Sequence, residues 1–326
     1  MTVGMTLGKF APLHRGHQSV IELALAQTDH VIVVIYNAVE VTSVPIEVRG
    51  GWIKKLYPSV EVIFAHDGPT TVSDDPAITA QHDAYLQRLL AGRGVTHFYS
   101  SEFYGDHVSR ALGAIDCRVD VNREIVPISG TAIRSNLFQL RRYIDPIVYR
   151  DLVTKVVFLG APCTGKTTLA QHMAAEYKTV WMPEYGREYW DAHQSERRLT
   201  QEQLVEIAEG HRQREDAMIL DVNQYFFIDT DATITYQFSR YYHAAVLPKL
   251  EQLAAECRSR YDIFCLCDTD IPYDDTWDRS GEVHRADFQA NLEADLKSRG
   301  TPLIRLRGSL SERAATVKQV LLRSKS

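Results

Sequence analysis

The N-terminal half of the chain alternates short apolar runs with longer amphipathic segments. Apolar runs that are typical of buried strands occur at residues 6–10, 31–35, 60–65 and 96–101 and near Arg118. Segments with apolar residues at helical spacing occur at 18–26, 46–56, 76–90 and 106–112, and a further helix opens at Ser129. Because strands that alternate with helices build βαβ units, this half predicts a parallel sheet with helices on both faces.

The alternation restarts at Lys155–Leu159, a continuous apolar strand that precedes a predicted helix over 166–177. Further strands are predicted at 179–182, 225–228, 261–266 and 303–306, and long helices at 200–220 and 244–258. The polar stretch Ile144–Thr154, which contains Pro146, separates the two series and is the natural seam between domains. The sequence therefore predicts an α/β protein with two doubly wound parallel-sheet domains, residues 1–148 and 149–326.

The composition is typical of a globular protein that binds small molecules. The chain has 326 residues, 45% of them hydrophobic and 24% charged, which suffices for two domains that each bury a core. No apolar run approaches the roughly 20 residues that span a bilayer, and no export leader precedes the first motif, so we expect a cytoplasmic protein without membrane insertion. The net charge of −6 and scattered basic residues argue against nucleic acid as a partner, whereas a homo-oligomer is compatible with the sequence.

The cysteines predict neither a disulfide framework nor a metal cluster. Their number is five, which is odd, and this agrees with a reduced compartment. The sequence Cys265-x-Cys267 lacks the two-residue gap and the second ligand pair of a zinc site. We expect both cysteines to be buried strand residues.

A phosphate-binding motif opens the second series of elements. Gly160-x-x-x-x-Gly165-Lys166-Thr167 follows a strand and begins a helix, which is the context that a P-loop requires. Lys166 is expected to neutralise the β and γ phosphates of ATP, and Thr167 to ligate Mg²⁺. The residues expected to bind the nucleotide are Gly160, Cys163, Thr164, Gly165, Thr167 and Thr168.

Carboxylates end a later strand of the same series. Asp229 and Asp231 follow the apolar run Phe226–Ile228, at the position from which an acid holds a metal ion or its water. We assign Asp229 to the metal ion and to catalysis. Asp231 is expected either to bind the acceptor substrate or to cap the following helix.

Two polar segments of this half suit acceptor binding. The run from Pro183 to Trp190 follows the second strand; in it Glu184 is expected to hold ribose hydroxyls or take a hydroxyl proton, and Tyr185 and Arg187 to contact the substrate. An aromatic ring in this run would stack on a base, unless it packs in the core. The segment from 270 to 285 has the composition of a lid, with Arg279 and Arg285 as phosphate clamps, or of a solvated loop.

The first motif lies near the N-terminus, between a strand and a helix. In Gly8-Lys9-Phe10-Ala11-Pro12-Leu13-His14-Arg15-Gly16-His17 both imidazoles and the helix N-terminus can converge on one anion. Two histidines three residues apart would also form half of a metal site, but no further ligand follows at helical spacing. Anion binding is the interpretation that we adopt.

A second motif follows downstream, Ile128-Ser129-Gly130-Thr131-Ala132-Ile133-Arg134. With these two motifs in this order, the first half of the chain resembles the nucleotidylyltransferase superfamily. The resemblance implies a Rossmann-like domain that transfers an adenylyl group from ATP. The agents that it implies for catalysis, beside a bound Mg²⁺, are Lys9, His14, His17 and Arg134. The residues that it implies for nucleotide binding are Gly8, Phe10, Gly16, Ser129 and Thr131.

Joined to a P-loop kinase, such a domain resembles NadR-like proteins, which combine nicotinamide mononucleotide adenylyltransferase with ribosylnicotinamide kinase. The run Glu184–Glu188 and the strand end Phe227–Asp231 belong to this resemblance. It implies that ATP phosphorylates ribosylnicotinamide and then adenylylates the mononucleotide to NAD, releasing pyrophosphate. Arg49 and Trp52 are then expected near the nicotinamide, unless Trp52 packs in the core.

Two departures and two alternatives accompany this interpretation. Some relatives carry an N-terminal helix-turn-helix repressor module, whereas this chain begins seven residues before Gly8, so we do not expect DNA repression. Trp277 stands in the lid where relatives often have glycine, so only the lid arginines are carried over. The alternatives are a pair of enzymes with another acceptor, and a non-catalytic NAD or ATP sensor that acts on a transporter or regulator.

Overall fold

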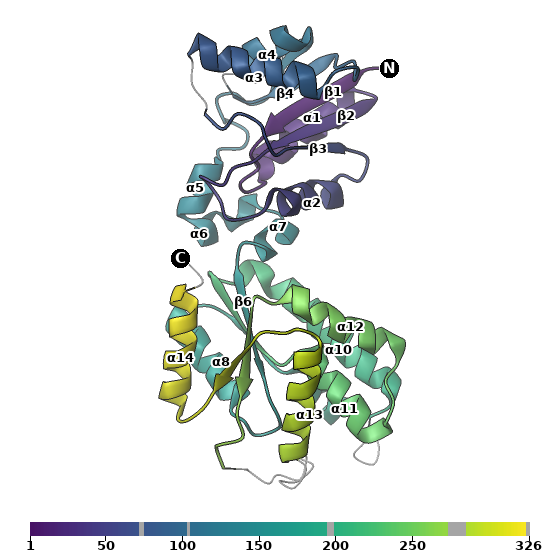
Figure 1. The fold of residues 1–326 in the computed structure, drawn as a ribbon, viewed down its shortest axis with the longest axis vertical. Coiled ribbons are helices and arrows are strands. Elements are labelled where there is room, and N and C mark those ends of the chain that lie inside the picture. Colours follow the sequence, from purple (N-terminus) through teal and green to yellow (C-terminus); the bar gives the residue numbers. More distant parts are fainter. Residues whose placement is uncertain (72–74, 103–104, 194–198, 273–284, 324–326) are drawn as a thin grey trace. The chain divides into compact units, whose positions relative to one another are not determined.

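The computed structural model describes residues 1–71, 75–102, 105–193, 199–272 and 285–323 (Figure 1). The chain divides into two compact units, Met1–Tyr149 and Arg150–Ser326. Each unit contains one five-stranded sheet in which neighbouring strands are parallel and helices flank both faces, which confirms the predicted fold class. The boundary between the two units lies within helix α7 (Pro146–Arg150). The predicted domain boundary, between residues 148 and 149, lies in the same helix.

The first unit has the strand order β3-β2-β1-β4-β5. Its strands are β1 (Val3–Gly8), β2 (His30–Tyr36), β3 (Glu61–Ala65), β4 (His97–Ser100) and β5 (Ile115–Arg118). Its helices, besides α7, are α1 (Arg15–Gln27), α2 (Ile46–Leu56), α3 (Pro76–Leu89), α4 (Gly105–Leu112), α5 (Gly130–Ser135) and α6 (Leu137–Leu140), with a 3₁₀ turn at Arg141–Tyr143.

The order of the first sheet reverses at β1, because β2 and β4 pair with its two sides. Helices α3 and α4 cover one face, where Tyr85, Leu86 and Val108 pack on Met5 and Val34. In an open parallel sheet, ligands bind beyond the carboxyl ends of the strands where the order reverses. The first motif lies at this place, because β1 ends at Gly8.

The second unit has the strand order β10-β9-β6-β8-β7. Its strands are β6 (Thr154–Leu159), β7 (Trp181–Met182), β8 (Tyr225–Asp229), β9 (Ile263–Cys267) and β10 (Leu303–Leu306). Its helices are α8 (Lys166–Tyr177), α9 (Tyr185–His193), α10 (Gln201–Met218), α11 (Ala232–His243), α12 (Pro248–Arg260), α13 (Arg285–Ser298) and α14 (Leu310–Arg323), with a 3₁₀ turn at Ile219–Asp221.

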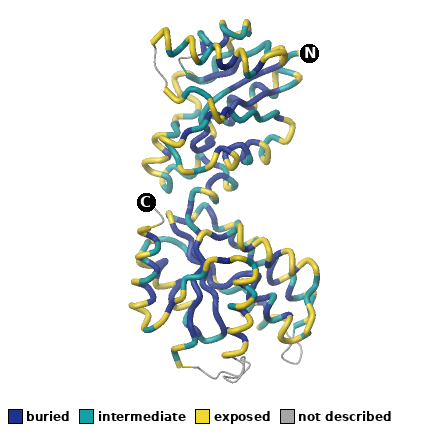
Figure 2. The backbone as a smooth tube through the Cα atoms, in the orientation of Figure 1, coloured by how far each residue is buried: buried dark blue, intermediate teal, exposed yellow. Residues whose placement is uncertain are grey.

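Strands β6, β8 and β9 form the buried centre of the second unit (Figure 2). Helices α8 and α14 pack together on one face, and α10, α11 and α12 lie together on the other (Figure 1). Cys265 and Cys267 are fully buried thiols in β9, as predicted. The order of this sheet reverses at β6, whose carboxyl end leads into the P-loop.

The prediction of a helix from Ala244 is wrong. Asp231 caps α11, which continues to His243, and Ala244 ends it in the left-handed region with φ 51°. The next helix starts at Pro248, because proline fits the first turn of a helix. Among the described residues, no helix combines the length and apolar character that a membrane crossing requires.

Candidate functional site

The P-loop of the second unit curls around the ammonium group of Lys166. This Nζ donates to the carbonyl oxygens of Gly160 and Ala161, both at 3.0 Å, and the lysine is 8% exposed. Gly160 has φ 142°, and a Cβ on it would lie 2.6 Å from the carbonyl oxygen of Cys267. A side chain at this position would therefore displace the loop from the sheet edge, which explains the first glycine of the motif.

Arginine side chains of α13 and α14 donate hydrogen bonds to backbone carbonyl oxygens of the P-loop. Arg285 donates to the carbonyl oxygen of Cys163 at 2.9 Å and to that of Ile271 at 3.0 Å, and Arg313 donates to that of Thr164 at 2.6 Å. The predicted phosphate clamp Arg285 is 5% exposed and serves instead to position the loop. The other predicted clamp, Arg279, and Trp277 lie outside the described residues.

Asp229 and Thr167 lie in contact with each other beside the P-loop. Thr167 Oγ1 donates to Asp229 Oδ2 at 2.5 Å. The carboxylate is fully buried, and its Oδ1 has no hydrogen-bond partner among the described residues. Burial raises the pKa of Asp229 to about 6, and the charge of Glu184 adds to the effect.

This donor set fits Mg²⁺, which binds through one or two protein oxygens together with waters and nucleotide phosphates. Within the described ranges, no three side chains of His, Cys, Asp or Glu form a metal site by themselves. Thr167 through its hydroxyl group and Asp229 through its carboxylate would therefore hold the ion together with ATP.

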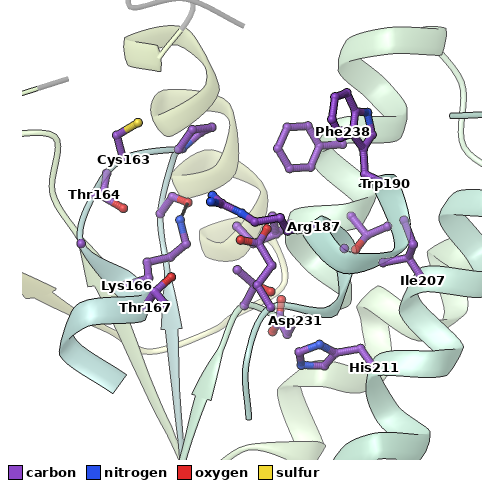
Figure 3. Close-up of a pocket in the computed structure, with 18 of the residues that line it drawn as sticks. Cys163, Thr164, Lys166, Thr167, Arg187, Trp190, Ile207, His211, Asp231 and Phe238 are labelled. Atoms are coloured by element: carbon purple, nitrogen blue, oxygen red, sulfur yellow. Dashed lines mark hydrogen bonds between the residues drawn. The ribbon is translucent and has the colours of Figure 1, made fainter. Parts of the chain in front are cut away.

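A cavity of about 500 Å³ extends from the P-loop between helices α9, α10 and α11 (Figure 3). The predicted residues that line it are Gly160, Cys163, Thr164, Gly165, Lys166, Thr167, Thr168, Glu184, Arg187 and Asp231. Asp231 caps α11, by accepting from the amide of Thr233 at 2.8 Å, and it also lines the cavity, where an acceptor would lie.

Trp190 lines the cavity together with His211, Phe238 and Tyr242, which the sequence did not reveal. Trp190 lies in the run that was predicted to supply an aromatic ring. Phe238 and Tyr242 stack with their ring centroids 6.0 Å apart, four residues apart on α11. Recognition of Asp231 as a helix cap, followed by aromatic residues at helical spacing, would have found this pair.

Tyr185 does not line this cavity. Its ring lies under the guanidinium of Arg214, with 4.0 Å between the guanidinium carbon and the ring centroid, and packs edge-on against Tyr189. The prediction that Tyr185 contacts the substrate is therefore not supported by its position, because helix packing takes up the ring.

The two motifs of the first unit meet around a second cavity of about 520 Å³. The predicted residues that line it are Lys9, Phe10, His14, Gly16, His17, Ser129, Thr131 and Arg134. Arg134 joins the motifs, because it donates to the carbonyl oxygen of Ala11 at 2.5 Å and to Thr131 Oγ1 at 3.0 Å.

Basic side chains of this cavity lie beside carboxylates. Lys9 Nζ is 2.5 Å from Glu40, and the Arg123 guanidinium is 3.2 Å from Glu102. Arg123 lines the cavity but stands in a loop without a recognisable motif, so the sequence reading missed it. Both cations add to a site that suits a polyphosphate.

A third cavity of about 260 Å³ adjoins the second. The residues that line both are Lys9, Phe10, His17, Ser101 and Glu102. Gly8 and the side chains of Tyr36, Leu86 and Val108 line the third alone. Two molecules bound in these cavities would therefore meet at Lys9 and His17.

Arg49 and Trp52 line neither cavity, although they were predicted to contact nicotinamide. Both are 1% exposed. Arg49 donates to the carbonyl oxygens of Tyr36 at 3.0 Å and Val44 at 3.2 Å, and also to that of Lys9. The arginine thus holds backbone around the first motif, and Trp52 is a core residue of α2, which was the alternative prediction.

His14 and His17 stack in parallel, with 3.7 Å between their ring centroids. Burial lowers the pKa of His14 to about 4, with help from the charge of Arg123. Burial, His14 and Arg123 also lower the pKa of His17 well below 6.5. Both rings are therefore neutral at neutral pH when no anion is bound.

We expect this pair to remain neutral on acidification. Because the folded pKa of His14 is about 4 against an ordinary 6.5, the folded state binds fewer protons between these values. The protein is therefore more stable above pH 6.5, where His14 is neutral in both states. This contribution to the free energy of unfolding, about 3 kcal/mol, is lost as the pH falls towards 4. In NMR spectra of the histidine ring carbons, recorded from about pH 8 to about pH 5, the chemical shifts of His14 and His17 should not change.

Variants His14→Asn and His17→Asn assign these signals, because each removes one of them. Bound ATP should raise both pKa values, since its negative charge favours the imidazolium form. Titration of either signal near its ordinary pKa in the ATP-free protein would contradict the buried geometry.

Comparisons with known proteins agree with this architecture. Residues 155–313 match the model of an AAA domain family. The chain is 27% identical, over 94% of its length and 78% of theirs, to the trifunctional NAD biosynthesis/regulator proteins NadR of Escherichia coli K12 and Salmonella typhimurium LT2.

Two crystal structures share the fold. A NadR protein in complex with NAD and AMP-PNP matches with TM-score 0.57 and 22% identity, over 98% of this chain and 95% of that chain. A NadR protein in complex with NR matches with TM-score 0.55 and 21% identity, over 94% and 89%. From the sequence similarity over almost its whole length and this shared fold, the chain is a homologue of the NadR proteins.

Proposed function

We propose that the protein is a bifunctional enzyme of NAD biosynthesis that uses ATP in both units. The second unit phosphorylates ribosylnicotinamide to nicotinamide mononucleotide, and the first transfers an adenylyl group from ATP to the mononucleotide, which gives NAD and pyrophosphate. The observation that carries this proposal is that each unit has its own phosphate-binding loop, and each loop opens into space for an acceptor.

In the second unit, Lys166 and the P-loop amides hold the β and γ phosphates, while Thr167 and Asp229 hold Mg²⁺. The ion, when bound, neutralises charge on the transferring phosphoryl group. Trp190, Phe238 and Tyr242 supply aromatic surface for the cationic pyridine ring. Arg187 faces the phosphate oxygens, Asp231 holds a sugar hydroxyl, and Glu184 takes the proton of the hydroxyl that is phosphorylated.

In the first unit, ATP lies in the larger cavity, with its triphosphate against His14, His17 and Arg134. The mononucleotide lies in the adjoining cavity, with its phosphate at the shared wall of Lys9 and His17. An oxygen of this phosphate attacks the α-phosphorus, and pyrophosphate leaves. Because the nucleophile is already an anion, positioning and charge neutralisation drive the step and no general base is required.

The relatives support this choice of acceptor. The NadR proteins of both bacteria are described as NAD biosynthesis proteins, and solved NadR structures contain NAD, an ATP analogue and NR. The assignment of residues 1–148 to adenylyl transfer and 149–326 to the kinase follows from the two loops. We infer a cytoplasmic location, because ATP, the proposed co-substrate, is abundant there.

The fate of labelled phosphate tests the proposal. With ribosylnicotinamide, Mg²⁺ and ATP labelled at the γ position, label should enter the mononucleotide and persist in NAD, with ADP as the other product. With ATP labelled at the α position, NAD should be the only pyridine compound that acquires label. Formation of NAD from added mononucleotide, together with no transfer of γ label from ATP to ribosylnicotinamide, would remove the kinase step.

A further inference from the structure

His211 of α10 is buried, with 5% exposure, yet it lines the acceptor cavity. Its Nε2 lies 3.1 Å from Glu215 Oε1, one helical turn along. Figure 3 shows the ring pointing from α10 towards Asp231. The proposed reaction has not so far used this residue.

Glu215 is held as a buried carboxylate behind His211, with 3% exposure. Arg260 Nε donates to its Oε2 at 2.7 Å, and the Tyr261 hydroxyl donates to its Oε1 at 2.7 Å. Burial by itself would raise the pKa of Glu215, but His211, Arg260 and Tyr261 together lower it. Its charge is therefore retained in the folded protein.

Glu215 occupies the side of the ring on which Nε2 lies, at 3.1 Å. The other ring nitrogen, Nδ1, is left to form a hydrogen bond with a molecule in the cavity.

Asp231 supplies an acceptor in the same cavity. Its Oδ1 is used by Thr233, whereas its Oδ2 is buried and has no hydrogen-bond partner in the described part of the chain. Burial raises the pKa of Asp231, while Thr233 and the thiol of Cys257 oppose this effect. Since a buried oxygen without a donor is costly, a donor from a ligand would stabilise this carboxylate.

We propose that His211 and Asp231 form hydrogen bonds with two hydroxyl groups on the sugar ring of the acceptor, so that His211 makes the kinase specific for an intact ribosyl group. Two hydrogen-bonding side chains match the two hydroxyl groups of a vicinal diol. This inference rests on the proposed kinase function of the second unit.

The test compares kcat/KM for ribosylnicotinamide and its 2′-deoxy and 3′-deoxy analogues in the full-length protein. In the wild type, loss of the hydroxyl that His211 binds should lower kcat/KM by about 10²–10⁴-fold, because a buried polar group is then left unpaired. In His211→Leu, the intact substrate should be poor, and removal of that hydroxyl should cost less than about 5-fold.

Two variants separate a direct contact from structural support. His211→Asn should restore part of the discrimination, because its amide oxygen lies near the position of Nδ1. Phe238→Leu, at the aromatic wall, should lower kcat/KM for all three nucleosides by a similar factor and keep their ratio. Circular dichroism and thermal unfolding of each variant report whether the second unit is folded, because adenylyl transfer depends on the first unit.

Unchanged discrimination in a folded His211→Leu protein would overturn the inference and leave the proposed function intact. The same holds if this variant loses only thermal stability, because the network would then serve to join α10 to α12 and β9. Failure of the wild type to phosphorylate ribosylnicotinamide would remove the proposed function, and the inference with it.

Discussion

Replacement of Lys166 by alanine is expected to abolish phosphorylation of ribosylnicotinamide and to leave adenylyl transfer to the mononucleotide at the wild-type rate. The Lys166 ammonium group is held by two P-loop carbonyl oxygens, at the place where the β and γ phosphates lie. Loss of this charge removes stabilisation that increases in the transition state, so kcat should fall by at least about 10²–10³-fold.

Separate assays of the two half-reactions measure this effect. Lys318→Ala is a matched control, because Lys318 lies on α14, is 39% exposed at its side chain and pairs with Glu176. The control should retain both activities. Loss of adenylyl transfer from a folded Lys166→Ala protein would mean that the two reactions share the P-loop.

Replacement of His17 by alanine is expected to have the reverse effect. The ring of His17 lines both cavities of the first unit, where the α-phosphate of ATP and the phosphate of the mononucleotide would meet. An imidazole there donates a hydrogen bond to the charge that develops on phosphate oxygens. Its loss should lower kcat/KM for adenylyl transfer by about 10²–10³-fold, while the kinase is unchanged.

A histidine of the same unit provides the control. His30 pairs with Glu61 and lines none of the cavities described above, so His30→Ala should leave both activities unchanged. If His17→Ala and His30→Ala slowed adenylyl transfer equally, loss of stability would explain the effect and the proposed role of His17 would be wrong.

The sequence was most informative where local chemistry determines structure. The bounds of α2, α8 and β10 coincide with the predicted ranges, because their apolar periodicity and flanking residues agree. The phosphate motifs lie at the ends of β1 and β6, since such loops need a strand before them and a helix after them. Parallel pairing followed from the alternation alone.

Residues whose roles depend on tertiary packing were harder to predict. Arg49 and Arg285 were assigned to ligands, but backbone carbonyl oxygens occupy their guanidinium groups. Their sequence neighbours give no sign of these distant partners. His211 and Arg123 were missed for the converse reason, because only the packing of α10 and the loop after β5 brings them to cavities.

Complementation between the two variants tests independent sites most directly. Given ribosylnicotinamide, ATP and Mg²⁺, Lys166→Ala alone and His17→Ala alone should each form no NAD, whereas their mixture should form it, with free mononucleotide passing from one protein to the other. A mixture that forms no NAD, although each variant retains its own half-reaction, would contradict two ATP sites that act in succession on one pyridine nucleoside.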